Sequence, residues 1–229
     1  MPIYLLDKEF KFPPAGLAGH DGLLAIGGDL SAERLLEAYR NGIFPWYSGG
    51  SPIMWWSPDP RLILMPQALK VRKSLRNVIN RGKFEVRVDQ NFEKVIKNCA
   101  KVPRQEQHDT WITEEIAQAY TRLFHLGFAH SVETYYKNKL VGGLYGISLG
   151  KAFFGESMFY EERDASKVAL YYLVELMKKW EFHFIDAQQE TDHLKSLGAC
   201  AIEREKFLNL LKNALKYPTR IGKWSLDDG

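Results

Sequence analysis

The sequence has few cysteines and no long apolar run, and each shortage excludes a class of protein. Cys99 and Cys200 lie far apart and form no Cys-x-x-Cys pair, which argues against a zinc ribbon or a disulfide scaffold. The longest apolar run, residues 140–150, is shorter than the roughly 18 residues that a membrane-spanning helix needs. The first twelve residues carry four charged side chains where a secretory signal has its apolar stretch. We therefore expect a soluble protein of a reducing cytosol.

Several common catalytic motifs are also missing. Ser157 lacks the second glycine of a nucleophile elbow, which argues against serine hydrolysis. Gly27-Gly28 is not followed by Gly-Lys-Ser/Thr, so a Walker phosphate-binding loop is excluded. The six histidines show no metal-ligand spacing, and we expect no metal site.

What the sequence does contain is apolar material and one concentrated block of positive charge. Hydrophobic residues make up 45% of the 229 positions, enough for a packed core and too many for a disordered chain. Residues 61–104 hold twelve Lys or Arg against three Asp or Glu, whereas both flanking segments are acidic. A surplus of positive charge that is confined to one segment favours a polyanion as the binding partner. A solvated helix face or attachment to a membrane surface are the alternatives.

The first 60 residues are rich in turns and predict one helix, at 31–41, with a polar cap at Asp29 or Ser31 and a stop at Gly42. The prolines at 58 and 60 indicate a domain boundary. We expect a small N-terminal domain at 1–62 and a larger domain at 63–229.

In the larger domain, apolar periodicity predicts helices that alternate with strands. The helices are expected at 66–81, 91–101, 113–127, 166–180 and around 207–215, and the strands at 131–136, 140–148, 152–158, 182–186 and 199–202. This order is typical of an α/β or α+β sheet domain.

Polar residues at the ends of two of these strands are the candidates for catalysis: Glu156, Asp186 and Gln188. An acidic residue at such a place is also common as a helix cap. Trp46 and Trp111 lie in loops, and aromatic loops beside basic helices are typical of proteins that bind an unpaired RNA end. A tryptophan in a proline-rich loop can equally anchor the loop to the core.

Eight motifs in order along the chain are shared with one protein family. They are DGLLAIGGDL (21–30), GIFPWY (42–47), WWSPDPR (55–61), TWIT (110–113), AHSVE (129–133), GESMF (155–159), ASK (165–167) and SLGA (196–199). Together they resemble the leucyl/phenylalanyl-tRNA–protein transferases over nearly the whole chain.

The resemblance implies a bacterial cytoplasmic enzyme that moves leucine or phenylalanine from tRNA onto the N-terminus of proteins that begin with arginine or lysine. The added residue marks the acceptor for degradation. The implied fold is a small N-terminal domain beside one similar to the acyl-CoA N-acyltransferases. Residues 160–167 contain no glycine, so the usual pyrophosphate signature is missing and we expect no cofactor. A monomer is the family expectation.

The resemblance also implies the site. Asp186 and Gln188, two residues apart on one strand face, would hold and partly deprotonate the acceptor amine. Independently of the resemblance, Glu156 is our candidate for the acceptor's positive first residue, because it is a carboxylate. The residues implied for the aminoacyl end of the donor are Trp46, Trp111, Leu144, Phe153, Met158, Leu170, Leu173 and Ile185. The residues expected to bind tRNA are Lys70, Arg72, Lys73, Arg76, Arg81 and Lys83.

The chemistry makes few demands on such an enzyme. An aminoacyl-tRNA is an activated ester, and an α-amine with a pKa near ~8 is roughly one tenth neutral at pH 7. Positioning can therefore supply much of the rate. Two rival functions stay open: a coenzyme A-dependent N-acyltransferase, against which the missing glycines argue, and a non-catalytic tRNA-binding protein.

Overall fold

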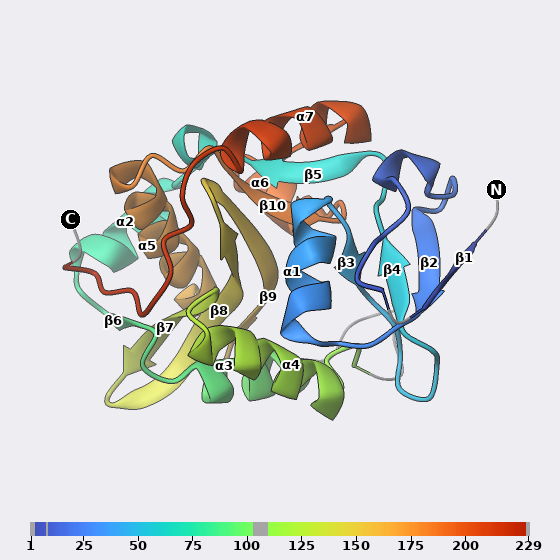
Figure 1. Ribbon diagram of the computed structural model, residues 1–229. Helices are drawn as coiled ribbons and strands as arrows, with labels where there is room; N and C mark the ends of the chain where they lie inside the picture. Colours follow the sequence, from blue (N-terminus) through green and yellow to red (C-terminus); the bar gives the residue numbers. More distant parts are fainter. Residues whose placement is uncertain (1–2, 8, 103–109, 228–229) are drawn as a thin grey trace.

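The structure is a computed structural model that describes residues 3–7, 9–102 and 110–227. Its N-terminal part is built on a small four-stranded sheet with the order β1-β2-β4-β3 (Figure 1). The strands are β1 (Tyr4–Leu6), β2 (Leu23–Gly27), β3 (Phe44–Pro45) and β4 (Met54–Trp56), with the short 3-10 helix η1 (Ala15–Leu17) and the helix α1 (Ala32–Arg40) between them.

The larger sheet has seven strands in the order β11-β5-β10-β9-β8-β7-β6. Their bounds are β5 (Arg61–Leu64), β6 (Glu85–Val88), β7 (Ala129–Tyr136), β8 (Lys139–Leu149), β9 (Ala152–Tyr160), β10 (Phe184–Gln188) and β11 (Cys200–Ile202). All neighbours pair antiparallel except β9 and β10, which are parallel and joined through the helix α5 (Ala165–Lys179). Antiparallel strands followed by this crossover agree with the expected mixed α/β, N-acyltransferase-like core.

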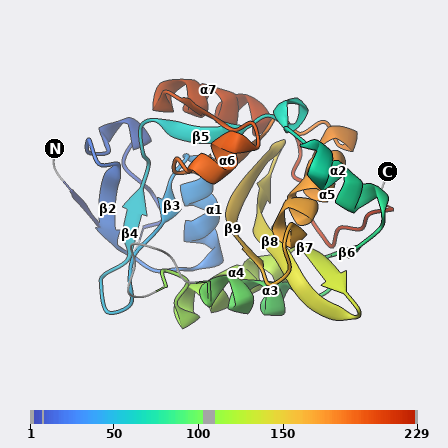
Figure 2. The same ribbon diagram turned by 180° about the vertical axis from the view of Figure 1, so that it is seen from behind.

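Helices cover both faces of this sheet (Figures 1 and 2). Alternation along β8 separates the two cores: Tyr145 packs with the cluster that includes α1, α3, α4 and α7, and Leu144 packs with the cluster under α5. The remaining helices are η2 (Pro66–Ala68), α2 (Lys73–Asn80), α3 (Phe92–Ala100), α4 (Glu114–His125), α6 (Asp192–Ser196) and α7 (Arg204–Ala214). In the described ranges no helix has the length and apolar content to cross a membrane.

Local signals in the sequence account for most helix ends. The Ser31 side chain accepts a hydrogen bond from the Arg34 N–H at the start of α1, and Gly42 follows this helix with a φ of 72°. Thr113 caps α4 by accepting from the Ile116 N–H. The predicted helices at 31–41, 91–101, 113–127 and 166–180 are therefore confirmed, with ends shifted by one or two residues.

The helix predicted at 66–81 is wrong, because the structure has η2, an extended stretch and only then α2. Within that stretch the Lys70 N–H donates to the Leu197 carbonyl, so contact with a distant loop overrides the apolar periodicity. The strands β1 to β6 were not predicted. They are short, and several lie among the prolines and glycines that indicated turns.

Candidate active site

A cavity opens where β9 and β10 part. Their parallel pairing runs from Phe184 opposite Ala152 to Asp186 opposite Phe154, and β9 continues beyond it without β10. The gap between the strands is a cavity of about 520 Å³, bordered on one side by residues 155–158 and on the other by residues 187–189. Divergence of two parallel strands thus creates room within an otherwise continuous sheet.

All eight residues expected to bind the aminoacyl end of the donor line this cavity: Trp46, Trp111, Leu144, Phe153, Met158, Leu170, Leu173 and Ile185. Strands of the large sheet and α5 supply the six aliphatic, thioether and phenyl side chains. The two indoles come from loops, Trp46 directly after β3 and Trp111 just before α4. Trp111 is only 5% exposed, so it forms a wall of the cavity and is not a free loop residue.

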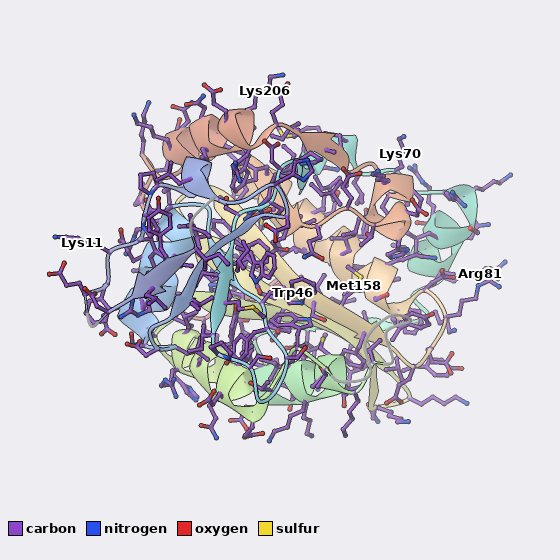
Figure 3. All side chains as sticks on the ribbon, turned by 90° about the vertical axis from the view of Figure 1, so that its right-hand side faces the viewer. Lys11, Trp46, Lys70, Arg81, Met158 and Lys206 are labelled. Atoms are coloured by element: carbon purple, nitrogen blue, oxygen red, sulfur yellow. The ribbon has the colours of Figure 1, made fainter. Side chains whose placement is uncertain are left out.

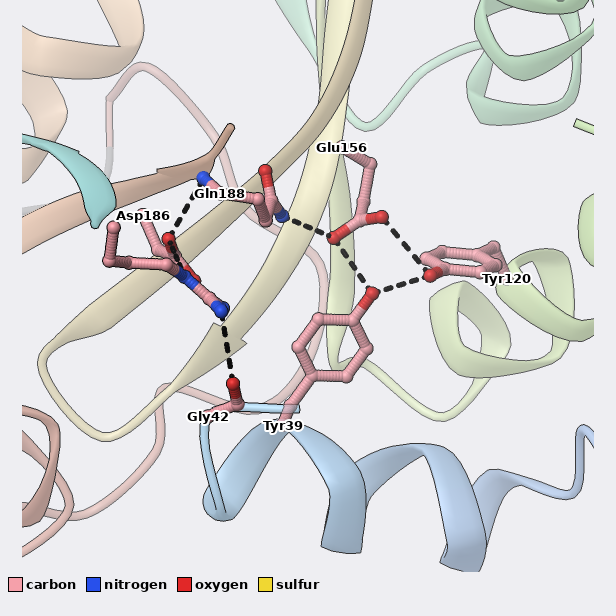
Figure 4. A network of polar contacts seen from close by, with 7 residues as sticks. Tyr39, Gly42, Tyr120, Glu156, Asp186 and Gln188 are labelled. Atoms are coloured by element: carbon pink, nitrogen blue, oxygen red, sulfur yellow. Dashed lines mark hydrogen bonds and ion pairs between the residues drawn. The ribbon is translucent and has the colours of Figure 1, made fainter. Parts of the chain in front are cut away.

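Glu156 forms the polar end of the cavity, and its carboxyl group is held by neutral donors (Figure 4). Tyr39 donates to Oε1 at 2.8 Å, and Tyr120 donates to Oε2 at 3.1 Å. The Gln188 amide nitrogen donates to Oε1 at 3.1 Å. The two tyrosine hydroxyls also contact each other at 2.5 Å. These contacts fix the carboxyl group between the two domains and the cavity.

Burial raises the pKa of Glu156 to about 8, although the hydrogen bonds from Tyr39 and Tyr120 oppose the shift. Both tyrosines have pKa values well above the ordinary phenol value, mainly because they are buried. At neutral pH the carboxyl group is therefore mostly protonated in the empty site. A cation that enters the cavity favours the ionised form and would draw the proton off.

Asp186 lies behind this arrangement and is 0% exposed. Its two oxygens accept from Arg61 Nε at 2.9 Å and Nη2 at 2.7 Å, and Arg61 also donates to the Gly42 carbonyl. The arginine lies against the rings of Phe44 and Phe207. The buried ion pair joins the first strand of the large sheet to β10 and to the end of α1.

The expectation that Asp186 and Gln188 share a strand face is wrong, because a bulge interrupts the strand between them. Gln188 has a φ of 56°, and its N–H donates to Asp186 Oδ1 at 3.0 Å. Gln188 lines the cavity together with Ile185, whereas Asp186 does not. The carboxylate thus holds the bulge that turns the Gln188 side chain toward the cavity and Glu156.

The residues expected to bind tRNA are distributed around α2, at an edge of the molecule seen in Figure 3. Lys73 and Arg76 lie on the helix and Arg81 caps its end. Lys70 and Arg72 lie in the extended stretch before it, and Lys83 pairs with Glu162 in the loop before α5. The predicted helix was wrong, yet the basic side chains remain grouped.

Sequence reasoning missed three members of the site. Tyr39, Tyr120 and Arg61 were not among the residues that the sequence analysis singled out. Arg61 ends the motif WWSPDPR, which was the one signal that could have marked it. No group of three or more potential metal-ligating side chains was found in the part of the chain that the structure describes.

Aminoacyl transfer requires apolar room for a side chain and a polar end that can hold an amine, and the cavity combines the two. Fold and site together fit an acyl-group transferase. Comparison with known families narrows the class. The model of the leucyl/phenylalanyl-tRNA protein transferase matches residues 63–212, and the model of its N-terminal domain matches residues 28–59. The chain belongs to this family and is an aminoacyltransferase.

Curated relatives with the name leucyl/phenylalanyl-tRNA--protein transferase match almost end to end. The protein of Nitratidesulfovibrio vulgaris (strain DP4) is 53% identical over 99% of this chain and 97% of its own. That of Syntrophobacter fumaroxidans is 55% identical over 92% and 90%. Solved structures are more distant: a conserved protein of unknown function from Bacteroides thetaiotaomicron is 12% identical, with a TM-score of 0.46 over 72% of this chain and 57% of its own.

Proposed function

We propose that this protein transfers leucine or phenylalanine from aminoacyl-tRNA to the α-amine of proteins that begin with arginine or lysine, and that the product is marked for degradation. The reaction needs charged tRNA, which places it in the cytoplasm. A monomer with a domain boundary near residue 62 completes the proposal. The two family models support the boundary, since one ends at 59 and the other begins at 63.

The observation that carries this proposal is the lining of the cavity. The eight side chains expected for the donor come from distant parts of the chain and meet around one space of about 520 Å³. In the proposal, Trp46 and Trp111 contact the terminal adenosine and the aliphatic side chains surround leucine or phenylalanine. Met158 is unbranched and adaptable, which lets one space accept both amino acids.

The polar end then receives the acceptor. Glu156 binds the guanidinium or ammonium group of the first residue and loses its proton as it does so, because a nearby cation lowers the pKa of a carboxyl group. Gln188, one hydrogen bond away, orients the acceptor amine toward the ester carbon. Asp186 is a positioning residue in this scheme. It holds the bulge through the Gln188 N–H while Arg61 occupies both of its oxygens.

Transfer on this scheme uses the ester as delivered. The neutral amine attacks the carbonyl carbon, the new C–N bond forms, the C–O bond to the ribose breaks, and the proton released by nitrogen leaves with the ribose hydroxyl. Oriented reactants reach effective molarities of ~10⁵–10⁸ M, so holding the amine beside the ester supplies most of the acceleration. A strong base is unnecessary, because an α-amine near its pKa of ~8 is already partly neutral.

One assay tests the proposal against its rivals. The purified protein is incubated with phenylalanyl-tRNA and an arginyl peptide, without ATP or coenzyme A, and peptide mass is followed. We expect the peptide to gain one phenylalanine residue. A gain in peptide mass that appears only when a thioester or nucleotide is supplied would contradict the proposal. Binding of the RNA without any transfer would also contradict it and would indicate a non-catalytic tRNA-binding protein. Glu156→Gln should abolish the preference for arginyl over alanyl peptides.

A further inference from the structure

A second cavity lies beside the first. It measures about 800 Å³. It shares Val102, Met158 and His193 with the cavity of about 520 Å³ described above, which is here called the aminoacyl cavity. Its other walls are the end of α3, the end of β9, the loop after β9 and the first turn of α5. The remaining lining residues are Asn98, Lys101, Phe159, Tyr160, Glu161, Arg163, Asp164, Ser166 and Lys167. The two spaces are thus neighbours with a common wall.

The second cavity differs from the first in charge. Three cationic side chains line it, Lys101, Arg163 and Lys167. Its two carboxylates are already engaged: Glu161 pairs with Lys139 at 2.7 Å, and Asp164 is shared between Arg163 at 3.8 Å and Lys167 at 3.2 Å. Within the described ranges Lys101 pairs with no carboxylate. The cavity therefore keeps positive charge that a single anionic group could use.

Tyr160 adds an aromatic surface to this charge. It is the last residue of β9, it lines the second cavity, and 66% of its surface is exposed. Among the exposed large apolar side chains in the described part of this domain, Tyr160 is the one that lines a charged cavity. An aromatic ring beside lysines is the combination with which proteins hold unpaired nucleotides, the ring stacking on a base and the cations meeting phosphates.

The position of the cavity connects it with the basic helix. Glu162, in the loop that walls the cavity, pairs with Lys83 just beyond α2 at 3.2 Å. In the view of Figure 3, Met158, which both cavities share, lies between Trp46 and Arg81. We expect an RNA strand that runs from α2 toward Trp46 to pass Met158, in the wall that the two cavities share.

We propose that the second cavity binds the unpaired nucleotides next to the terminal adenosine of the donor RNA, with Lys101 and Lys167 at a phosphodiester group and Tyr160 stacked on a base. This rests on the proposed function, since it assigns a place to the part of the donor that lies between the aminoacyl cavity and the helical stem.

The test compares two short donors, phenylalanyl-adenosine and the phenylalanylated trinucleotide cytidylyl-cytidylyl-adenosine. Only the second reaches beyond the aminoacyl cavity. For the native protein we expect a lower KM with the trinucleotide. Lys101→Gln should raise the KM for the trinucleotide about tenfold relative to that for phenylalanyl-adenosine. It should also reduce the slope of log KM against log salt by about 0.7, the share of one phosphate contact on a single strand.

Two matched controls isolate the site. Lys97 lies one helical turn before Lys101 on α3, is 61% exposed on its side chain, pairs with Glu93 and lines neither cavity. Lys97→Gln should leave the ratio of the two KM values as it is in the native protein. Tyr160→Leu should raise that ratio about fivefold through lost stacking, whereas the same change at the exposed Tyr217 should not.

The outcomes separate the two proposals. Equal KM values for both donors with the native protein, or a Lys101→Gln effect of the same size on both, would overturn the assignment and leave the transfer activity standing. If Lys101→Gln raised only the KM of the acceptor peptide, the second cavity would be a binding site for the acceptor polypeptide, and the nucleotide assignment would be overturned. If neither short donor nor full-length phenylalanyl-tRNA yields product, transfer from RNA itself is refuted, and the nucleotide assignment falls with it.

Discussion

Two clusters of buried polar residues in the described part of the chain can be compared, one that borders the first cavity and one that borders neither of the two cavities described above. The cavity cluster consists of Arg61, Asp186, Glu156, Gln188 and the two tyrosines at 39 and 120. The second cluster, here called the Asp89 cluster, consists of Asp89, His130, Ser131, Glu133 and Trp224. None of the residues of the Asp89 cluster lines either cavity described above.

The Asp89 cluster holds three separate segments of the chain together. Asp89 accepts from the His130 ring and from the backbone N–H groups of Ser131 and Trp224, and the His130 ring stacks on the Trp224 indole with 3.6 Å between centroids. It thereby joins the turn after β6, the strand β7 and the segment after α7. Burial lowers the pKa of His130, so its ring tends to stay neutral.

The comparison shows that a shifted pKa does not identify a functional site. Burial raises the pKa of Glu133 to about 7 and that of Glu156 to about 8. The same physical cause acts on both, yet Glu133 accepts hydrogen bonds from backbone and a serine inside a closed cluster, whereas Glu156 faces a space that a ligand can enter. Access, more than electrostatics, separates the two.

The largest effect is expected from breaking the ion pair between Arg61 and Asp186 in the cavity cluster. Arg61→Met leaves the Asp186 carboxylate buried without a cation, and we expect a loss of about 3–5 kcal/mol in the free energy of unfolding. Denaturant titration measures it. Since Asp186 also holds the bulge at Gln188, transfer activity should fall in the fraction that remains folded.

Arg34 is the matched control for this change. It is equally buried, but its carboxylate partner Asp29 is 53% exposed on its side chain and can be rehydrated when the arginine is lost. Arg34→Met should therefore cost less than half as much as Arg61→Met. Equal losses would show that burial of an arginine, and not the stranded carboxylate, determines the cost.

The next effect concerns the Asp89 cluster and stability alone. Since the pKa of Glu133 rises from 4.5 to about 7 on folding, the folded state holds its proton more tightly, and stability from this group is lost as pH rises from about 4.5 to about 7. Glu133→Gln removes this loss, so the difference in unfolding free energy between variant and native protein should grow by about 3 kcal/mol from pH 4.5 to pH 8.

Transfer kinetics provide the contrast for Glu133→Gln. Because Glu133 lies outside both cavities, the KM for donor and acceptor should match the native values at 25 °C. A stability difference that does not change with pH would contradict the protonation of Glu133 in the folded protein. A raised acceptor KM would show that the two clusters communicate.

The sequence predicted the composition of the cavity better than its geometry. All eight side chains that the resemblance implied for the donor line the cavity, and so do Glu156 and Gln188. Only Trp46, Trp111, Glu156 and Met158 lie within the shared motifs, and the others were inferred from their neighbourhood. The sequence could not predict the bulge at Gln188, since alternation along a strand is a local rule and the bulge depends on Arg61, more than a hundred residues away. The strands β5 and β6 escaped for the same reason, because they pair with segments far away along the chain, whereas β1 to β4 are short strands among turn residues.

A smaller effect tests whether Glu156 binds the cationic side chain of the acceptor's first residue. With a pKa of about 8 the carboxyl group is only about one tenth ionised at pH 7. Binding of N-acetyl-arginine amide, which has no amine that titrates here, should therefore tighten about tenfold between pH 7 and pH 9. Calorimetry measures the affinity and, at pH 7, the proton released. Glu156→Gln should bind weakly at both pH values, and a native affinity that is flat with pH would contradict the assignment.

The smallest effect concerns the neutral donors that distinguish Glu156 from Asp186. Tyr120 donates to Glu156 Oε2, and this hydrogen bond favours the ionised carboxylate. Tyr120→Phe keeps the ring and removes the donor, so the pKa of Glu156 should rise further. Because a net hydrogen bond contributes about 1 kcal/mol, N-acetyl-arginine amide should bind about fivefold more weakly at pH 7 and recover much of its affinity at pH 9. An equal loss at both pH values would mean that the phenol shapes the cavity and does not control the charge of its carboxyl group.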